Sequence, residues 1–149
     1  MKHSAEYYIE HLEMEPHVEG GYFKECLLEK EERNLWSSIY FMLAKGEVSH
    51  FHRLKSDEVW YYHDGNALTI YMIDEAGKLT AAKLGLDLEK GEVPQVLVPK
   101  GMIFGSAMEE EGFSLVGCMV SPCFKYEEFE LFDRNELLEK YPCLLYTSD

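Results

Sequence analysis

Two histidines one residue apart, followed closely by a glutamate, are the residues of this sequence with the clearest capacity for chemistry. His50 and His52 lie in "VSHFHRL", and Glu58 opens "EVWYYH". Imidazole and carboxylate groups can hold a metal ion or exchange protons with an organic ligand. Residues i and i+2 of a β-strand share a face, so we expect His50 and His52 to point the same way and Phe51 and Arg53 to point the other way.

The elements that must position these residues are predicted to be strands. Turn signals such as Asp64-Gly65-Asn66 and Pro99-Lys100-Gly101 separate nine short segments rich in aromatic and β-branched residues. These segments are "GYFKECLLE", "LWSSIYFMLA", "VSHFHRL", "EVWYYH", "ALTIYMID", "LTAAKLG", "PQVLVP", "MIFGSAM" and "FSLVGCMV". Many short strands without helices between them indicate an all-β barrel or a jelly roll of two sheets.

Only the two ends of the chain have helical spacing. Ser4 is the expected cap of the first helix, and Asn135 is the expected cap of the second, which Pro142 would end. A chain of 149 residues has the usual size of one domain. We therefore predict a single domain, with an N-terminal helix in residues 1–16, a barrel in 17–132, and a C-terminal helix and tail in 133–149.

The charge of the chain excludes several partners. The formal net charge is -14, and the acidic runs, such as "EKEER" in residues 29–33, are expected to be solvated loops. Such a surface repels a phosphate backbone, so we expect no binding to nucleic acid or to anionic membranes. The longest apolar run has about six residues, far fewer than the roughly 20 of a membrane-spanning helix.

The four cysteines predict the cellular setting. Cys26, Cys118, Cys123 and Cys143 form no C-x-x-C pair, so we interpret them as packing residues or free thiols. The start of the chain lacks the apolar segment of a secretory signal. Both observations favour a cytoplasmic protein.

The spacing of the reactive residues resembles a known motif. The pattern H-x-H-x5-E-x6-G, from His50 through Glu58 to Gly65, is similar to the first sequence motif of the cupin superfamily. Pro99-Lys100-Gly101 fits the second cupin motif, but Phe104 occupies the position of its histidine. The metal-binding form of the pattern therefore lacks its last ligand.

A narrower resemblance covers nearly the whole chain. The blocks "EPHVEGGYFKE", "SSIYFMLAKGEVSHFHRLKSDEVWYYHDG", "PQVLVPKGMIFG", "FSLVGCMVSPCFKYEEFEL" and "LLEKYP" resemble the cupin 5 family, also known as DUF985. The resemblance implies a cupin double-stranded β-helix, which is a jelly-roll barrel, and a homodimer. It implies little about the reaction.

In such a barrel the candidate catalytic residues are His52, as a base, and Glu58, which would orient it. The carboxylates of "EGGYFKE" are expected to close one mouth of the barrel, and large amphipathic side chains on the strand of Glu58 are expected to line the lumen. The predicted ligand-binding residues are Tyr22, Glu25, His50, Trp60, Tyr62, Gln95 and Phe104. No metal and no other cofactor is expected, because Phe104 replaces the last ligand.

Three functions are consistent with these residues. The first is a barrel that binds a small polar ligand (a sugar, a nucleotide-sugar or a carboxylate-like molecule) and isomerises or epimerises it without a metal, an analogy at the level of the fold. The second is a module that binds or senses a small molecule without chemistry. The third is a metal-dependent enzyme using His50, His52 and Glu58. Phe104 counts against the third, but the sequence does not separate the first two, and so it does not decide whether the protein is an enzyme.

Overall fold

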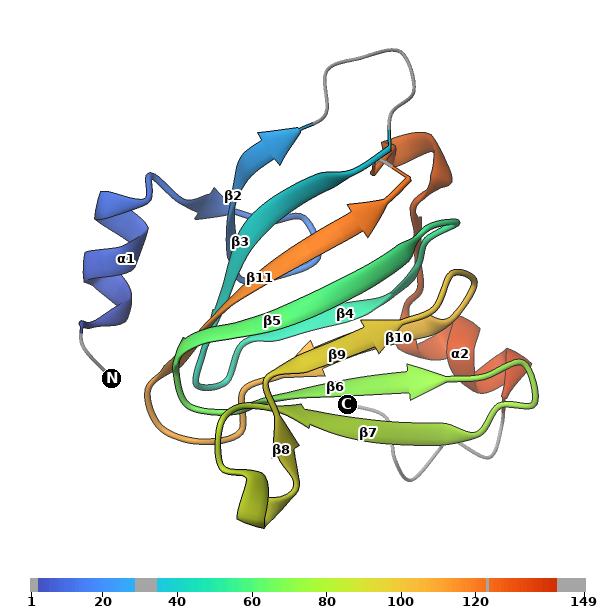
Figure 1. Cartoon of the computed structure of the whole chain (residues 1–149). Helices are drawn as coiled ribbons and strands as arrows, with labels where there is room; N and C mark the ends of the chain where they lie inside the picture. The colour runs from blue at the N-terminus through green and yellow to red at the C-terminus, as the bar shows by residue number, and fades with distance from the viewer. Residues whose placement is uncertain (1–2, 29–34, 123, 142–149) are drawn as a thin grey trace.

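The computed structural model describes residues 3–28, 35–122 and 124–141. Its strands form two six-stranded sheets that pack against each other (Figure 1). The first sheet has the order β1 (Glu15–Pro16), β2 (Tyr22–Leu28), β3 (Ser37–Ala44), β11 (Phe113–Ser121), β5 (Asp57–Gly65), β9 (Gln95–Val98). The second has the order β12 (Glu130–Leu131), β4 (Val48–Arg53), β10 (Ile103–Ala107), β6 (Leu68–Ile73), β7 (Leu79–Leu84), β8 (Glu92–Val93).

The prediction of an all-β protein is confirmed. Each of the nine predicted segments contains one strand, from β2 to β7 and from β9 to β11. The remaining strands β1, β8 and β12 have two residues each, which is too short for an alternating pattern. Neighbouring strands pair antiparallel, except for β7 and β8.

The two helices flank the sheets. Helix α1 (Ala5–His11) starts after Ser4, whose Oγ accepts a hydrogen bond from the Tyr7 N–H at 3.1 Å, so this predicted cap is confirmed. Helix α2 (Arg134–Lys140) is capped by Asp133, whose Oδ1 accepts from the Glu136 N–H at 2.7 Å.

The predicted cap Asn135 is therefore wrong. Asp133 takes this role because its backbone is extended, whereas Asn135 already lies in the first turn of α2. Two 3₁₀ helices, η1 (Leu88–Lys90) and η2 (Tyr126–Glu128), complete the described elements. None of the described helices has the length and apolarity needed to cross a membrane. The predictions for residues 29–33, Cys123, Pro142 and Cys143 fall outside the described residues.

Three apolar clusters hold the layers together. The largest lies between the sheets and includes Phe41 and Trp60 from the first sheet and Phe104 from the second. The second joins α1 to the outer face of the first sheet, and the third joins α2 to the outer face of the second (Figure 1). The candidate site lies beside the central cluster, in a cavity lined by both polar and apolar side chains.

Candidate functional site

A cavity of about 330 Å³ opens between the two sheets, and we call it the lumen cavity. Its walls come from β1, β2, β3, β5 and β11 of the first sheet, from β4 of the second, and from the loop between β1 and β2. Its lining residues are Glu15, His17, Glu19, Phe23, Glu25, Ser37, Ile39, His52, Leu54, Glu58, Cys118, Val120 and Phe124. The volume is at the lower end of the range for small-molecule sites, roughly 300 to 1,000 Å³.

His52 and Glu19 form a buried ion pair in this cavity. Nε2 of His52 lies 2.9 Å from Oε2 of Glu19, and the side chains are only 3% and 9% exposed. The other ring nitrogen, Nδ1, lies 2.8 Å from the carbonyl oxygen of His50. Both ring nitrogens of His52 therefore have acceptors within the protein, which favours the doubly protonated imidazolium.

The pKa values of the pair move apart. Burial alone would raise the pKa of Glu19, but the charge and hydrogen bond of His52, with smaller effects of His17 and His50, together lower it by more, so the net shift is downward. Burial alone would lower the pKa of His52, but Glu19, with smaller effects of Glu58 and the carbonyl of His50, raises it by more, so the net shift is upward. Each partner stabilises the charged form of the other.

Two glycines allow Glu19 to reach His52. Gly20 and Gly21 have φ angles of +113° and +73°. A Cβ on Gly20 would lie 2.0 Å from the carbonyl oxygen of Val48, and one on Gly21 would lie 2.4 Å from that of Met42. Only glycine permits this close approach to β4 and β3. The Glu19 carbonyl then accepts a hydrogen bond from the His50 N–H at 2.8 Å, which fixes the loop to β4.

Glu58 is the third ionisable group of the lumen cavity. It is 7% exposed, and its Oε1 has no hydrogen-bond partner among the described residues. Burial and the negative charge of Glu19 raise its pKa from the ordinary 4.5 to about 8, while His52 and the nearby indole N–H of Trp60 lower it by less. The Trp60 N–H does not make a hydrogen bond of standard geometry with it. Glu58 is therefore mostly a neutral carboxylic acid at pH 7.

His17 and Cys118 are two further ionisable residues of the lining. Nδ1 of His17 accepts a hydrogen bond from the Glu19 N–H at 3.0 Å. Burial lowers the pKa of His17, an effect that Glu19 opposes, so its imidazole is neutral at pH 7. Burial and the charges of Glu58 and Glu19 raise the pKa of the Cys118 thiol well above its usual value, so it stays protonated.

The expectation that His50 and His52 share a face is wrong. Phe104 of β10 pairs with His52 and Ser106 pairs with Ser49, so β4 has one more residue than β10 between these two pairs. This β-bulge breaks the alternation. His52 is consequently buried in the lumen cavity, and His50 is exposed on the outside of the sheet.

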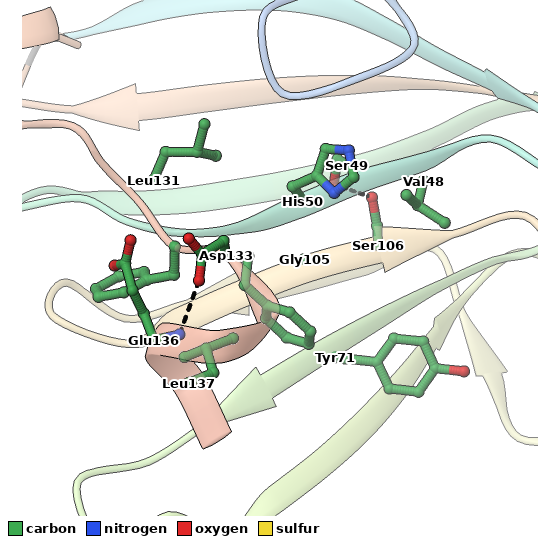
Figure 2. Close-up of a pocket in the computed structure, with 12 residues that line it drawn as sticks. Val48, Ser49, His50, Tyr71, Gly105, Ser106, Leu131, Asp133, Glu136 and Leu137 are labelled. Carbon is green, nitrogen blue, oxygen red and sulfur yellow. Dashed lines mark hydrogen bonds between the residues drawn. The ribbon is translucent and has the colours of Figure 1, made fainter. Parts of the chain in front are cut away.

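His50 lines a second cavity, of about 520 Å³, which we call the outer cavity. Figure 2 shows His50 on β4 and Leu137 on α2 at opposite sides of this hollow, with Tyr71 from β6 at its edge. Its other lining residues are Val48, Ser49, Phe51, Gly105, Ser106, Leu131, Phe132, Asp133 and Glu136. The outer cavity is larger, but its lining lacks a buried ionisable pair, so we assign the candidate site to the lumen cavity.

Of the predicted ligand-binding residues, only Glu25 lines the lumen cavity together with His52 and Glu58. Tyr22 precedes Phe23 and packs on the outer face with α1, because neighbouring residues of a strand face opposite ways. Gln95 is exposed on β9.

The remaining predicted aromatic residues pack in or against the central cluster. Trp60 is buried between Phe41 and Phe104. Phe104 lies behind the imidazole of His52, with ring centroids 4.1 Å apart, so it supports that side chain. Tyr62 packs against the cluster, and its hydroxyl donates to the carbonyl of Gly65 at 2.5 Å.

The described residues do not fit a metal site. No group of three or more His, Cys, Asp or Glu among them is placed to hold a metal ion. The alternative set of His50, His52 and Glu58 is not brought together, because the bulge turns His50 outward.

Sequence reasoning placed Glu19 at a barrel mouth and missed that it is the partner of His52, because the two residues are 33 positions apart. It also missed His17 and Cys118 as lining residues. The block "EPHVEGGY" was the available signal, since it places three ionisable residues, Glu15, His17 and Glu19, shortly before two glycines.

Comparison with known proteins agrees with this fold. The model of the Cupin superfamily family DUF985 (Cupin 5) matches residues 6–132, so the chain belongs to this family. A crystal structure of a protein from Shewanella oneidensis is 58% identical, with a TM-score of 0.91 over 95% of this chain and 92% of that one. A hypothetical protein from Leishmania major is 37% identical, with a TM-score of 0.86 over 95% and 94%.

A more distant similarity shows the fold alone. Oxalate decarboxylase from Bacillus subtilis is 19% identical, with a TM-score of 0.63 over 78% of this chain and 29% of that one. No curated protein matches the chain.

Proposed function

We propose that the lumen cavity binds a small polar organic molecule and that Glu58 is the group that contacts it. The observation that carries the proposal is the free oxygen of this carboxyl, which is 7% exposed and lines the cavity without a hydrogen-bond partner among the described residues. A buried polar atom without a partner costs roughly 1 to 3 kcal/mol, so a ligand that bonds to it gains that energy.

The His52–Glu19 pair has a different role in this proposal. Both nitrogens of His52 already face acceptors of the protein, at 2.8 and 2.9 Å. His52 is therefore a positioning residue that holds Glu19 and fixes the electrostatic environment of Glu58. This revises the sequence-based assignment of His52 as a base that Glu58 orients.

Proton transfer is a second candidate function, favoured by one observation. A pKa of about 8 lets Glu58 donate and accept a proton near neutral pH, which is the condition for efficient general acid–base catalysis. One such group can remove a proton from a carbon and return it to the neighbouring carbon, as in an isomerase. The homodimer and the cytoplasmic location remain predictions from the sequence.

The first experiment looks for a retained ligand. Untagged protein is purified and analysed by native mass spectrometry, then denatured, and the released small molecules are identified. We expect a non-protein mass that is present in the wild type, lost in Glu58→Leu, which removes the carboxyl oxygens, and retained in Glu136→Leu, which makes the same change in the outer cavity. Equal retention in Glu58→Leu would contradict the proposal.

The second experiment separates an enzyme from a binding module. The identified molecule is incubated with the protein in deuterated water, and proton exchange at its carbon atoms is followed by NMR. Exchange that Glu58→Gln abolishes would establish proton transfer. If the molecule binds without proton exchange, the result favours a binding module over an enzyme.

A further inference from the structure

We infer that the molecule held in the lumen cavity is a small organic cation, an amine in its ammonium form with an apolar body. This inference rests on the proposed function, and it names the ligand class that the site accepts.

The ionisable groups around the cavity are mainly acidic. Four carboxyl groups line it, from Glu15, Glu19, Glu25 and Glu58, and the described lining contains no lysine and no arginine. Glu15 and Glu25 are exposed, and a ligand entering past them meets negative charge.

The single positive charge of the lining is already used. It belongs to His52, which Glu19 neutralises at 2.9 Å. The neutral His17 and the protonated Cys118 add no charge. A carboxylate or phosphate would therefore enter past the exposed Glu15 and Glu25 and find no free cation in the described lining, so the carboxylate-like and nucleotide-sugar ligands suggested by the sequence fit poorly.

The Glu58 carboxyl supplies an independent observation that points to a donor. Its Oε1 is buried, lacks a partner among the described residues and lines the cavity. In its ionised form the Glu58 carboxyl has only acceptors. An ammonium group offers this form three N–H donors and a charge, whereas a ligand carboxylate offers it only further acceptors.

The remaining walls fit the apolar body of such a ligand. Phe23, Ile39, Leu54, Val120 and Phe124 contribute the apolar lining. Aromatic faces also attract a cation, which adds to the preference for an ammonium group over an alcohol.

Proton balance gives the inference a measurable signature. In the free protein, Glu58 is mostly the neutral acid near pH 7, with Glu19, His52 and Trp60 as the groups that set this state. Binding an ammonium ion favours the carboxylate, so the Glu58 O–H bond breaks and the proton leaves to the buffer. The complex is then an ammonium–carboxylate pair, and the affinity should rise with pH between about 6 and 8.

The experiment compares three probes of similar shape and different charge: 3-methylbutylamine, 3-methylbutan-1-ol and 3-methylbutanoate. Binding is measured by NMR titration and by calorimetry in buffers of different ionisation enthalpy. We expect the amine to bind about tenfold more tightly than the alcohol, the carboxylate not to bind, and close to one proton to be released per amine bound.

Two variants assign the effect to the site. Glu58→Gln should abolish the proton release and reduce the preference for the amine by about tenfold, and Glu136→Gln, in the outer cavity, should change neither. If the alcohol or the carboxylate binds as tightly as the amine, the inference is overturned and the proposed function stays intact. The same holds if the retained ligand is identified as a neutral sugar or an anion. If none of the probes binds and no ligand is retained, the result counts against both the inference and the proposed function.

Discussion

The lumen cavity and the outer cavity lie on opposite faces of β4, and each receives one of the paired histidines. His52 is 2% exposed and is held between Glu19 and the carbonyl of His50. His50 is exposed beside α2 and has no such ion pair with any residue that the structure describes. The comparison shows that burial, rather than residue type or spacing, decides which histidine takes part in a charged network.

The carboxyl groups of the two cavities differ in the same way. Burial raises the pKa of Glu58 to about 8, so it remains a neutral acid in the lumen. Glu136 is exposed in the first turn of α2. A carboxyl that stays protonated at pH 7 lowers the stability of the fold, which is a common feature of functional sites.

The largest difference in stability is expected between the alanine variants of the two histidines. His52→Ala removes the partner of the buried Glu19 carboxylate and should lower the free energy of unfolding at pH 7 by about 3 to 5 kcal/mol. His50→Ala should change it by less than about 0.5 kcal/mol, because the side chain is exposed. Urea unfolding of both variants measures this difference. Similar losses in the two variants would show that the histidines are not distinguished by burial.

Glu58→Gln should raise the free energy of unfolding, whereas His52→Ala lowers it. The folded pKa of Glu58 is about 8 against an ordinary 4.5, so ionisation of the unfolded chain lowers stability as pH rises between these values. The variant should therefore be more stable than the wild type at pH 8, by up to about 4 kcal/mol, and similar to it at pH 4. Denaturant unfolding across this pH range measures the slope. Glu136→Gln is the control and should follow the wild type.

The loop between β1 and β2, which carries Glu19 into the lumen cavity, should respond to a single methyl group. Gly20→Ala places a Cβ against the Val48 carbonyl at a φ of +113°, which should cost about 2 to 3 kcal/mol and displace Glu19. Gly46→Ala meets no atom within 4 Å at a φ of +83°, so it should cost only the backbone strain of about 1 kcal/mol. Thermal unfolding compares the two variants. If Gly20→Ala and Gly46→Ala lower stability equally, the loop is able to move away from Val48 without a further loss of stability.

The smallest effect belongs to an ion pair on the outside of β4. Arg53 contacts Glu130 of β12 at 2.9 Å, and the side chains are 28% and 50% exposed. Arg53→Ala should lower stability by less than about 1 kcal/mol, and the loss should shrink at high salt. Urea unfolding at low and high salt tests this. A salt-independent loss as large as that of His52→Ala would contradict the distinction between the two faces.

The sequence predicted the parts of the fold that depend on local pattern. The nine longer strands follow from runs of aromatic and β-branched residues between turn signals, and Ser4 follows from the chemistry of helix caps. The spacing from His52 to Glu58 also placed both residues among those that line the lumen cavity. These features depend on residues that are close together in the chain, so the local sequence is enough to predict them.

Only the tertiary structure decided the contacts that make the site. The bulge in β4 arises from its register with β10, and this one extra residue turns His50 away from His52. Glu19 reaches His52 because Gly20 and Gly21 let a distant loop approach β3 and β4. The pKa of Glu58 follows from the depth at which the two sheets bury it beside Glu19. Register, close approach and burial depend on which strands become neighbours, and no local pattern in the sequence determines that.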